Sequence, residues 1–331
     1  MHMADALIAP AVAGIMYAAS GAAAGYSIHE VRLENDQKKI SEMGVMGAFV
    51  FAAQMINFTI PGTGSSGHLC GGMLVSAILG PYAGFLTMIG VLLIQCLLFA
   101  DGGLLALGCN VWNMAFYGCF LGSLLIWRPI MRCGASKKKI IAASILGCTL
   151  TLQLGAFSVC LETLASGVTE LPFTSFLAVM QPIHLAIGLV EGVITAAVLC
   201  FVYEARPNLL WGIGETTETG RLSRKKTLGI LAGAAVVSGG VLSLFASALP
   251  DGLEWSMEQI AGTAELEASG GIYAFFAGIQ NFTALLPGYS LGGSGSAAGT
   301  SVSGLIGAAI VLLVCVGCGV LFQKFKKRKT S

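Results

Sequence analysis

Apolar runs of about 20 residues recur along the chain, and short polar stretches separate them. An α-helix needs roughly 20 apolar residues to cross the hydrocarbon core of a bilayer, which is about 30 Å thick. This pattern predicts an all-α integral membrane protein. The runs of that length lie at about residues 4–26, 40–60, 104–127, 140–160, 183–203, 228–249 and 302–323.

One apolar run, residues 69–100, is longer than the others. A single helix of that length would extend about 48 Å at 1.5 Å per residue. Gly80-Pro81 interrupts it, and proline both removes a helical hydrogen bond and keeps the preceding residue out of the α region. We therefore expect a break at this dipeptide and two crossings, of which the first is short.

The distribution of charge tests this break independently. Charged residues make up only 11% of the chain and the net charge is +1, so the positions of Lys and Arg carry the information. Lys and Arg are enriched on the cytoplasmic side of membrane proteins. If residues 69–100 cross twice and the N-terminus lies outside, the basic stretches at 32–39, 128–139 and 221–226 and the basic tail all fall inside. We therefore expect nine crossings, with the N-terminus outside and the C-terminus inside.

The sequence PGTGSSGHLCGG, residues 61–72, has the glycine spacing of a nucleotide-binding P-loop. A P-loop also needs a Lys followed by Ser or Thr, and here His68 and Leu69 occupy those positions. We instead expect irregular backbone that forms a tight cap near membrane depth, where such backbone is tolerated if it is buried in protein or lines a cavity. The glycines expected to shape this cap are Gly62, Gly64 and Gly67.

The predicted topology puts this loop and the N-terminus on the same side of the membrane. The chain begins Met1-His2, and the Met1 amine, the His2 backbone nitrogen and the His2 imidazole can close two chelate rings, one five-membered and one six-membered, on one metal ion. A planar set of nitrogens suits Ni(II) or Cu(II), and His68 is the candidate fourth ligand. The alternatives are a His2 present by chance, a His68 that only hydrogen-bonds within its loop, and a cleaved signal peptide, although the basic start of a signal peptide is missing.

Four further polar residues are candidates for supporting the metal ligands. Gln54 and Asn57 lie just before the loop, where either side chain can hydrogen-bond a ligand imidazole and fix its tautomer, or simply end a helix near the interface. His184 and Glu191 are seven residues apart and share one face of an expected span. Ionisable groups inside membrane spans are usually functional or paired. We expect neither His184 nor Glu191 to be a direct ligand.

Three segments closely resemble the CbiM/NikM substrate-capture component of energy-coupling factor transporters for cobalt and nickel. They are MHMADALIAP at the N-terminus, QMINFTIPGTGSSGHLCGG at residues 54–72 and HLAIGLVEGVITAAV at residues 184–198. The resemblance covers residues 1 to about 210 and implies a seven-helix capture module in this part of the chain. It also implies that the Met1 amine, two nitrogens of His2 and the His68 imidazole hold the metal. It does not distinguish Ni(II) from Co(II).

A second unit follows a basic cytoplasmic linker at residues 211–227. It has two further transmembrane helices within residues 228–323, an outer loop at 250–300 and a basic tail at 324–331. The strings LPDGLEW and LPGYSLGG resemble a PDGLE or CbiN-type domain, although the family's second Pro-Asp-Tyr reads Pro287-Gly288-Tyr289 here. The acidic outer loop either concentrates cations near its opening or is an ordinary solvated loop. Its acidic residues are Asp251, Glu254, Glu258, Glu265 and Glu267.

The chain has no nucleotide-binding motif with which to power transport. The resemblance therefore implies a transport subunit, not an enzyme, that holds no cofactor and captures one Ni(II) or Co(II) ion. The expected partners are a coupling transmembrane protein and ABC-type ATPase subunits in the plasma membrane of a prokaryote, with no nucleic acid. Small residues on the first span suit close helix packing within the module or against a partner. These are Gly14, Ala18 and Ala22.

Two functions of other classes compete with this interpretation. A stand-alone secondary divalent-metal transporter would be expected to have two structural repeats with ionisable groups at the midplane, and only Glu191 fits. A membrane metalloenzyme would need a general base beside an open metal position, and no HExxH-like pair is present. The secondary transporter is the stronger of the two alternatives.

Overall fold

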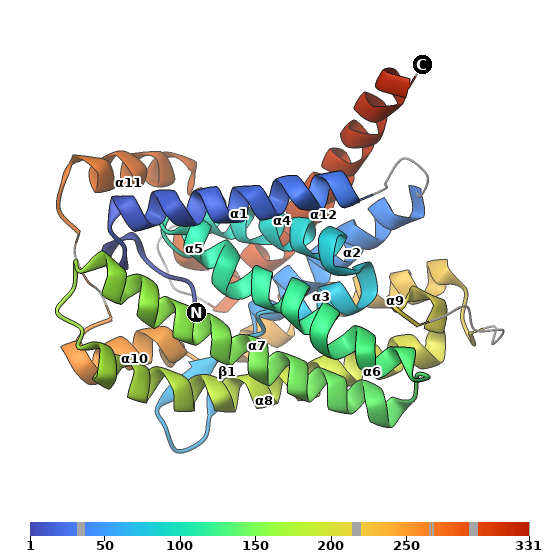
Figure 1. The fold of residues 1–331 in the computed structure, drawn as a ribbon, viewed down its shortest axis with the longest axis horizontal. Helices are drawn as coiled ribbons and strands as arrows, with labels where there is room; N and C mark the ends of the chain where they lie inside the picture. The colour runs from blue at the N-terminus through green and yellow to red at the C-terminus, as the bar shows by residue number, and fades with distance from the viewer. Residues whose placement is uncertain (32–36, 214–219, 265, 267, 291–296, 331) are drawn as a thin grey trace.

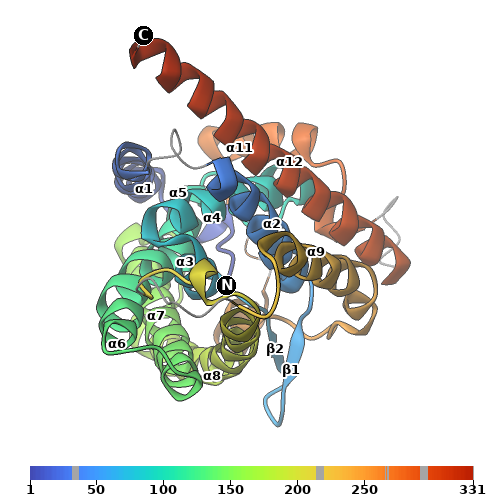
Figure 2. The same ribbon diagram turned by 90° about the vertical axis from the view of Figure 1, so that its right-hand side faces the viewer.

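The computed structural model describes residues 1–31, 37–213, 220–264, 266, 268–290 and 297–330. Within them the chain is a bundle of helices with one short β-hairpin, which confirms the all-α prediction (Figures 1 and 2). Arg32, Glu265 and Glu267, residues 214–219 of the linker and residues 291–293 of LPGYSLGG lie outside the described residues. The helices are η1 (Asp5–Leu7), α1 (Pro10–Glu30), α2 (Gln37–Gln54), α3 (Gly72–Leu79), α4 (Pro81–Phe99), α5 (Leu107–Val111), η3 (Trp112–Trp127), α6 (Arg128–Arg132), α7 (Lys137–Ser166), α8 (Phe173–Ala205), η4 (Pro207–Leu209), α9 (Arg224–Gly240), η5 (Leu242–Phe245), α10 (Gly252–Ala261), α11 (Gly271–Thr283), η6 (Pro287–Tyr289) and α12 (Ala297–Thr330).

Seven helical segments in the described part of the chain are long and apolar enough to cross a membrane. Large apolar side chains are exposed along them, for example Leu150 and Leu161 on α7 and Leu189 on α8. Soluble proteins rarely expose apolar surface of this extent, so the chain is a multi-pass membrane protein. The seven segments are Pro10–Glu30, Pro81–Phe99, Leu107–Arg132, Lys137–Ser166, Phe173–Ala205, Arg224–Phe245 and Ala298–Leu321.

Two of the nine expected crossings, α2 and α3, are not among these seven segments. α2 carries Lys38, Lys39 and Glu42 within its first two turns. α3 has 8 residues, a length of about 12 Å, and all of them are buried. The expectation of nine crossings therefore remains a prediction.

The break expected at Gly80-Pro81 is confirmed. α3 ends at Leu79 and α4 begins at Pro81, and Gly80 between them has φ 81° and ψ 169°, a conformation that favours glycine. A Cβ at Gly80 would lie 2.9 Å from the Trp211 ring. The backbone conformation and the contact with Trp211 both require glycine at this turn.

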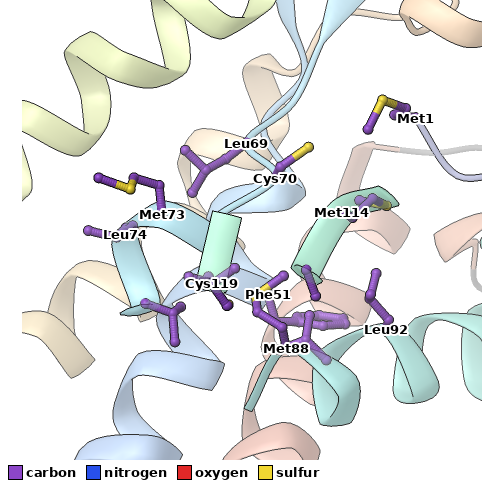
Figure 3. Packing of buried hydrophobic residues seen from close by; sticks show 14 of the residues in the cluster. Met1, Phe51, Leu69, Cys70, Met73, Leu74, Met88, Leu92, Met114 and Cys119 are labelled. Atoms are coloured by element: carbon purple, nitrogen blue, oxygen red, sulfur yellow. The ribbon is translucent and has the colours of Figure 1, made fainter. Parts of the chain in front are cut away.

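The N-terminal helices enclose a continuous apolar core. α7 and α8 pack along each other, α7 also packs against η3, and α3 packs against η3 and α4 (Figure 1). The core includes the first residue of the chain, and Figure 3 shows Met1, Leu69, Cys70 and Met73 among the packed side chains. The chain terminus is therefore a structural part of the interior.

The C-terminal helices α9 and α12 pack against α2 and against each other (Figure 2). Glycines permit this close approach: a Cβ at Gly44 would lie 2.7 Å from Val316 Cγ2, and one at Gly307 would lie 2.1 Å from Phe51 Cζ. Between these two helices in the sequence, α10 packs on α8 and on the hairpin, and α11 packs on α4. α10 and α11 thus lie at the end of the bundle where α1 begins (Figure 1).

α6 and the starts of α7 and α9 lie at the end of the bundle opposite α10 and α11 (Figure 1). Lys137 at the start of α7 pairs with Glu204 at the end of α8. Arg224 at the start of α9 pairs with Glu42 near the start of α2, with 2.9 Å between nitrogen and oxygen. The helix ends that the sequence assigns to the inner side are therefore neighbours.

Candidate metal centre

The first three residues thread into the interior of the bundle, where the N-terminus lies (Figures 1 and 2). The Met3 N–H donates to Asn110 Oδ1 (2.7 Å), and the Met3 carbonyl accepts from Asn110 Nδ2 (3.1 Å) and from the Gly103 N–H (2.8 Å). Met1 and Met3 are 4% and 0% exposed. These bonds anchor the segment at Met3 and so place the Met1 amine and His2 at a defined position.

The loop after α2 is a β-hairpin. β1 (Phe58–Ile60) pairs antiparallel with β2 (Ser65–Gly67). Gly62 and Gly64 in the turn have φ 78° and 77°, so both adopt the left-handed conformation that glycine tolerates. The expectation of irregular backbone is therefore wrong for Ser65–Gly67, which form β2, because the glycines make a turn tight enough for the flanking residues to pair. It is confirmed for the turn at residues 61–64 and for residues 68–71, which are neither helix nor strand.

The hairpin is held on both sides by distant parts of the chain. The Ser66 N–H donates to the Pro250 carbonyl (2.8 Å), and the Ser66 hydroxyl donates to the Leu249 carbonyl (2.7 Å). On the other side, a Cβ at Gly67 would lie 2.7 Å from Ile187 Cγ1, so glycine is needed for this approach to α8. These contacts fix the position of His68, the residue that follows β2.

The Met1 amine and the His68 side chain, 67 residues apart in sequence, meet inside the protein. The Met1 nitrogen lies 3.1 Å from His68 Nε2. His68 Nδ1 donates to the Leu69 carbonyl (3.1 Å), so Nε2 carries the lone pair that faces the amine. The rings of His2 and His68 stack with centroids 5.3 Å apart and 22° between their planes. The structure therefore brings the three proposed ligand residues together.

His2 lies between two oxygen atoms. Its Nδ1 is 3.2 Å from Asp101 Oδ1, and its Nε2 is 3.2 Å from Gln95 Oε1. Only a doubly protonated ring satisfies both oxygens, but burial lowers the pKa of His2 to about 4 against the attraction of Asp101. The ring is thus neutral at pH 7, and one nitrogen faces an oxygen with no proton between them. A cation at Nδ1 would remove this mismatch, because the proton on Nε2 can then be donated to Gln95.

Gln95 and Gln54 connect His2 to the loop after His68. Gln95 Nε2 donates to Gln54 Oε1 (3.0 Å), which directs Gln95 Oε1 toward His2. Gln54 Nε2 donates in turn to the Cys70 carbonyl (2.9 Å). Gln54 therefore reaches the imidazole through Gln95. The sequence does not predict Gln95 as part of the site, because one polar residue within an apolar run forms no pattern.

Asn57 and Glu191 contact different parts of the surrounding backbone. Asn57 lines the cavity beside the site, and its carbonyl accepts from the Ser247 N–H (2.8 Å). The two oxygens of Glu191 accept from the N–H groups of Cys70 and Gly71, each at 3.0 Å. Glu191 thus holds the loop that carries His68 and does not itself touch the imidazole.

Asp251 of the C-terminal unit belongs to the site. Its carboxylate contacts the Met1 ammonium directly and lies 3.7 Å from His68 Nε2. The same carboxylate caps α10 by accepting from the N–H groups of Leu253 (2.8 Å) and Glu254 (2.9 Å). From the sequence, Asp251 is predicted only as one residue of an acidic outer loop. The Asp-x-x-Glu spacing of a capping box was a signal for the helix start, but not for the contact with Met1.

Burial and mutual attraction act in opposite directions on the Asp251–Met1 pair. Burial opposes the charged forms of both groups, but their attraction prevails. It holds the pKa of Asp251 well below its usual value, and it raises the pKa of the Met1 amine above its usual value of 8.0. The amine is therefore protonated at pH 7, and it must lose that proton before its lone pair can bind a metal.

The altered motif Pro287-Gly288-Tyr289 also reaches the site. The Tyr289 hydroxyl donates to Asp101 Oδ2, while the other oxygen of Asp101 faces His2. Gly288, at the position of the family's Asp, has φ 58° and lines the neighbouring cavity. Tyr289 therefore connects the C-terminal unit to His2 through Asp101. No sequence pattern predicts Asp101 as part of the site.

A cavity of about 1000 Å³ lies between the N-terminal helices and the C-terminal unit and opens onto the two imidazoles. Its described lining contains no Lys or Arg. A cavity lined by carboxylates attracts cations by its negative potential. The lining carboxylates are Asp5, Asp101, Asp251 and Glu254.

Side chains alone do not form a metal site in the part of the chain that the structure describes. No three His, Cys, Asp or Glu side chains there are close enough together to hold an ion. A metal at the meeting point of Met1, His2 and His68 therefore needs the terminal amine and a backbone nitrogen as well. Such a nitrogen set, with imidazoles, suits Ni(II), Co(II) and Cu(II) better than the hard cations that prefer oxygen.

Comparison with protein families gives two matches. Residues 2–209 match the family described as "Cobalt uptake substrate-specific transmembrane region", CbiM. Residues 225–324 match the PDGLE domain. The two matches cover the two units expected from the sequence motifs.

Two fused transport proteins are similar over nearly the whole chain, and a solved structure is similar over a smaller part of it. A protein of Archaeoglobus fulgidus named "Putative fused nickel transport protein NikMN" is 39% identical, with 94% of this chain and 96% of that protein covered. A "Probable fused nickel transport protein LarMN" of Lactiplantibacillus plantarum is 28% identical over 96% and 97% of the two chains. A crystal structure described as a truncated transition metal transporter is 29% identical, with a TM-score of 0.54 over 62% of this chain and 99% of its own.

Proposed function

Because the chain belongs to the CbiM family of cobalt-uptake transmembrane proteins and carries a PDGLE domain, we propose that it is the substrate-binding subunit of an energy-coupling factor importer for Ni(II) or Co(II). It is a transport protein and not an enzyme. The observation that carries the proposal is the meeting of the Met1 amine and His68 Nε2, 3.1 Å apart, beside the His2 ring. One ion is captured there from the outer side.

Four nitrogens hold the ion in this proposal: the Met1 amine, the His2 backbone nitrogen, His2 Nδ1 and His68 Nε2. The amine and His68 Nε2 then occupy adjacent corners of a square. With metal–nitrogen bonds of about 2.0–2.1 Å, adjacent corners are ~2.9 Å apart. The two atoms are 3.1 Å apart in the structure, so they need little movement to accept an ion. Asp251, by contrast, has to leave the amine.

The donor set restricts the cargo. Zn(II) prefers tetrahedral sites, and Mg(II) and Ca(II) prefer oxygen ligands, so a planar nitrogen site disfavours all three. Cu(II) fits such a site, and its exclusion depends on its availability. The names of the two fused relatives refer to nickel and that of the matching family to cobalt, which supports testing both metals.

We extend the proposal to the topology and the division into domains. The capture module comprises residues 1–210, the linker 211–227, the PDGLE-like unit 228–323 and the tail 324–331. In nine crossings the short α3 would complete its crossing together with the non-helical residues before it. The Trp211 N–H donates to the Ala77 carbonyl (2.8 Å), which supports placing the end of α3 at the inner side, next to the linker.

Energy has to come from partners, which we propose to be a coupling membrane protein and ABC-type ATPase subunits. The small-residue stripe on α1 is a candidate docking surface, because Gly14, Ala18 and Ala22 are all exposed in this chain. A Cβ at Gly14 would meet no atom within 4 Å. Small residues let a partner helix approach closely.

Calorimetric titration of Ni(II) and Co(II) into the detergent-purified chain tests the capture site. Insertion of one Gly between Met1 and His2 breaks the chelate rings, and His68→Ala removes the fourth nitrogen. We expect each change to weaken binding by at least about 100-fold, or ~2.7 kcal/mol. His29→Ala is the control, because His29 is exposed on α1. Unchanged affinity in both site variants would place the site elsewhere.

Transport by the chain alone separates the proposal from a secondary transporter. Proteoliposomes containing only this chain are expected to show no ATP-independent net Ni(II) uptake. Uptake that follows an ion gradient without any partner would instead favour the alternative.

A further inference from the structure

We propose that His184 is a relay ligand that receives Ni(II) or Co(II) from the N-terminal chelate on the inner side of the site. This inference rests on the proposed function and extends it to a metal-binding position beyond the four nitrogens. It stands on the orientation of one buried imidazole and on the small cavity into which that imidazole faces.

The His184 ring is held in the form that a metal requires. Its Nδ1 donates to the Met180 carbonyl, 2.8 Å away and one turn earlier on α8. The proton is therefore on Nδ1, and Nε2 carries a free lone pair. A backbone carbonyl that fixes the outer nitrogen of an imidazole is a common second contact of metal-binding histidines.

The Nε2 atom of His184 is buried and unpaired. The residue is 1% exposed, and Nε2 has no hydrogen-bond partner among the described residues. Leaving a buried acceptor unpaired costs free energy, so a partner for this atom is expected. The candidate partner for Nε2 is the metal ion that the neighbouring N-terminal chelate binds.

A cavity of about 10 Å³ joins His184 to the metal ligands. Met1, His68 and Asp251 line it together with His184. Such a volume holds about one small atom. Gly252 keeps the space open, because a Cβ there would lie 3.2 Å from His184 Nε2 and 3.1 Å from Cε1.

His184 lies beyond the chelate as seen from the outside. The large outer cavity is lined by His2, His68 and Asp251 but not by His184. An ion from that cavity therefore meets the chelate first. A second small cavity is lined by Glu191 and, like the cavity at His184, by Cys70. Glu191 is seven residues and about 10.5 Å along α8 from His184. The outer cavity, the cavity at His184 and the cavity at Glu191 are therefore arranged in this order toward the inner side, the last two along α8.

The metal-binding groups near His184 suit transient binding of the ion. His68, Asp251 and His184 are not arranged as a finished three-residue site. Two imidazoles and a carboxylate bind Co(II) and Ni(II). They lack the two chelate rings of the N-terminus, so an ion held by them is easier to release than one held by the chelate.

The test uses Co(II) as the probe and the full chain in detergent. His2→Ala removes the chelate, and the residual Co(II) binding and its visible ligand-field absorption are then measured. We expect residual binding that weakens at least about tenfold, with loss of the absorption band, when His184→Phe is added to His2→Ala. His29→Phe in the same background is the matched control, since it removes the exposed histidine, and should change nothing. If the His184→Phe protein does not fold, His184→Gln keeps a polar side chain but no imidazole and is expected to lose the band.

The outcomes separate the two proposals. If His2→Ala binds as tightly as the unaltered chain, the proposed chelate is wrong. If His2→Ala loses tight binding but the residual binding is absent or indifferent to His184→Phe, the relay is wrong and the chelate stands. That second result would also be obtained if Nε2 of His184 pairs only with a buried water.

Discussion

Replacing Glu191 with Leu is expected to weaken Ni(II) binding by about 30- to 140-fold. Glu191 is 2% exposed, and its two oxygens accept from the N–H groups of Cys70 and Gly71 at 3.0 Å each. These are the second and third residues after His68, so the carboxylate fixes the direction in which the chain leaves the proposed ligand. Leu has a similar size but no acceptor.

The size of the affinity loss follows from the two N–H groups, of Cys70 and Gly71, that Glu191→Leu leaves without an acceptor. A buried N–H without a partner costs about 1–3 kcal/mol, so the two together cost roughly 2–6 kcal/mol. The loop can relieve part of this cost only by shifting, and a shift moves His68 away from the Met1 amine. If about 2–3 kcal/mol is transferred to binding, the affinity falls about 30- to 140-fold at 1.4 kcal/mol per factor of ten. Glu191→Gln keeps one acceptor and should lose about tenfold.

Calorimetric titration of Ni(II) measures this effect, and thermal unfolding in the same detergent reports whether the variants fold. Glu162→Gln is the matched control. Glu162 is also a buried carboxylate, 6% exposed on α7, but it accepts from Asn113 Nδ2 (2.7 Å) and does not contact the His68 loop. A folded Glu191→Leu protein that binds Ni(II) as tightly as the unaltered chain would refute the positioning role.

Three further predictions test other contacts of the site. Ni(II) affinity should rise at least about tenfold per pH unit below the pKa of the Met1 amine, because the metal must displace the proton of the amine. Asp251 holds that pKa above 8.0, so in Asp251→Asn the rise should level off at lower pH. Titrations of Ni(II) at several pH values measure both effects. Gln95→Leu should weaken Ni(II) binding about 10- to 100-fold, measured by calorimetry, because the proton on His2 Nε2 loses its acceptor. Ala18→Trp should abolish co-purification with a co-expressed coupling protein while leaving Ni(II) affinity unchanged, since Ala18 is exposed on α1 and does not line the cavity beside the ligands.

The helical framework could be read from the sequence because its causes are local. A run of apolar residues predicts a span wherever it lies, and Pro81 ends the preceding helix through its own ring. The hairpin at residues 58–67 depends instead on a distant partner, since Ser66 is held by the carbonyls of Leu249 and Pro250. No pattern within residues 61–72 contains that information.

The candidate site was likewise predictable only where its causes are local. Met1 and His2 are adjacent, so their joint ability to chelate is visible in the sequence, and the predicted topology was sufficient to bring His68 to the same side. Gln95 and Asp101 become part of the site only because α4 ends beside His2. A polar residue at the end of an apolar span usually needs no special explanation, and only tertiary structure distinguishes these two.

The C-terminal unit contributes to the charge balance of the site at two points. Asp251 contacts the Met1 amine, and Tyr289 holds Asp101, which faces His2 Nδ1. Both contacted nitrogens are proposed metal ligands. An arriving ion therefore has to displace Asp251 from the amine, and it relieves the mismatch between His2 Nδ1 and Asp101. The second contact does not need the Asp that Gly288 replaces, because the Tyr289 hydroxyl makes it. The altered motif therefore keeps its connection to the site, and an account of ion capture has to include both domains of the chain.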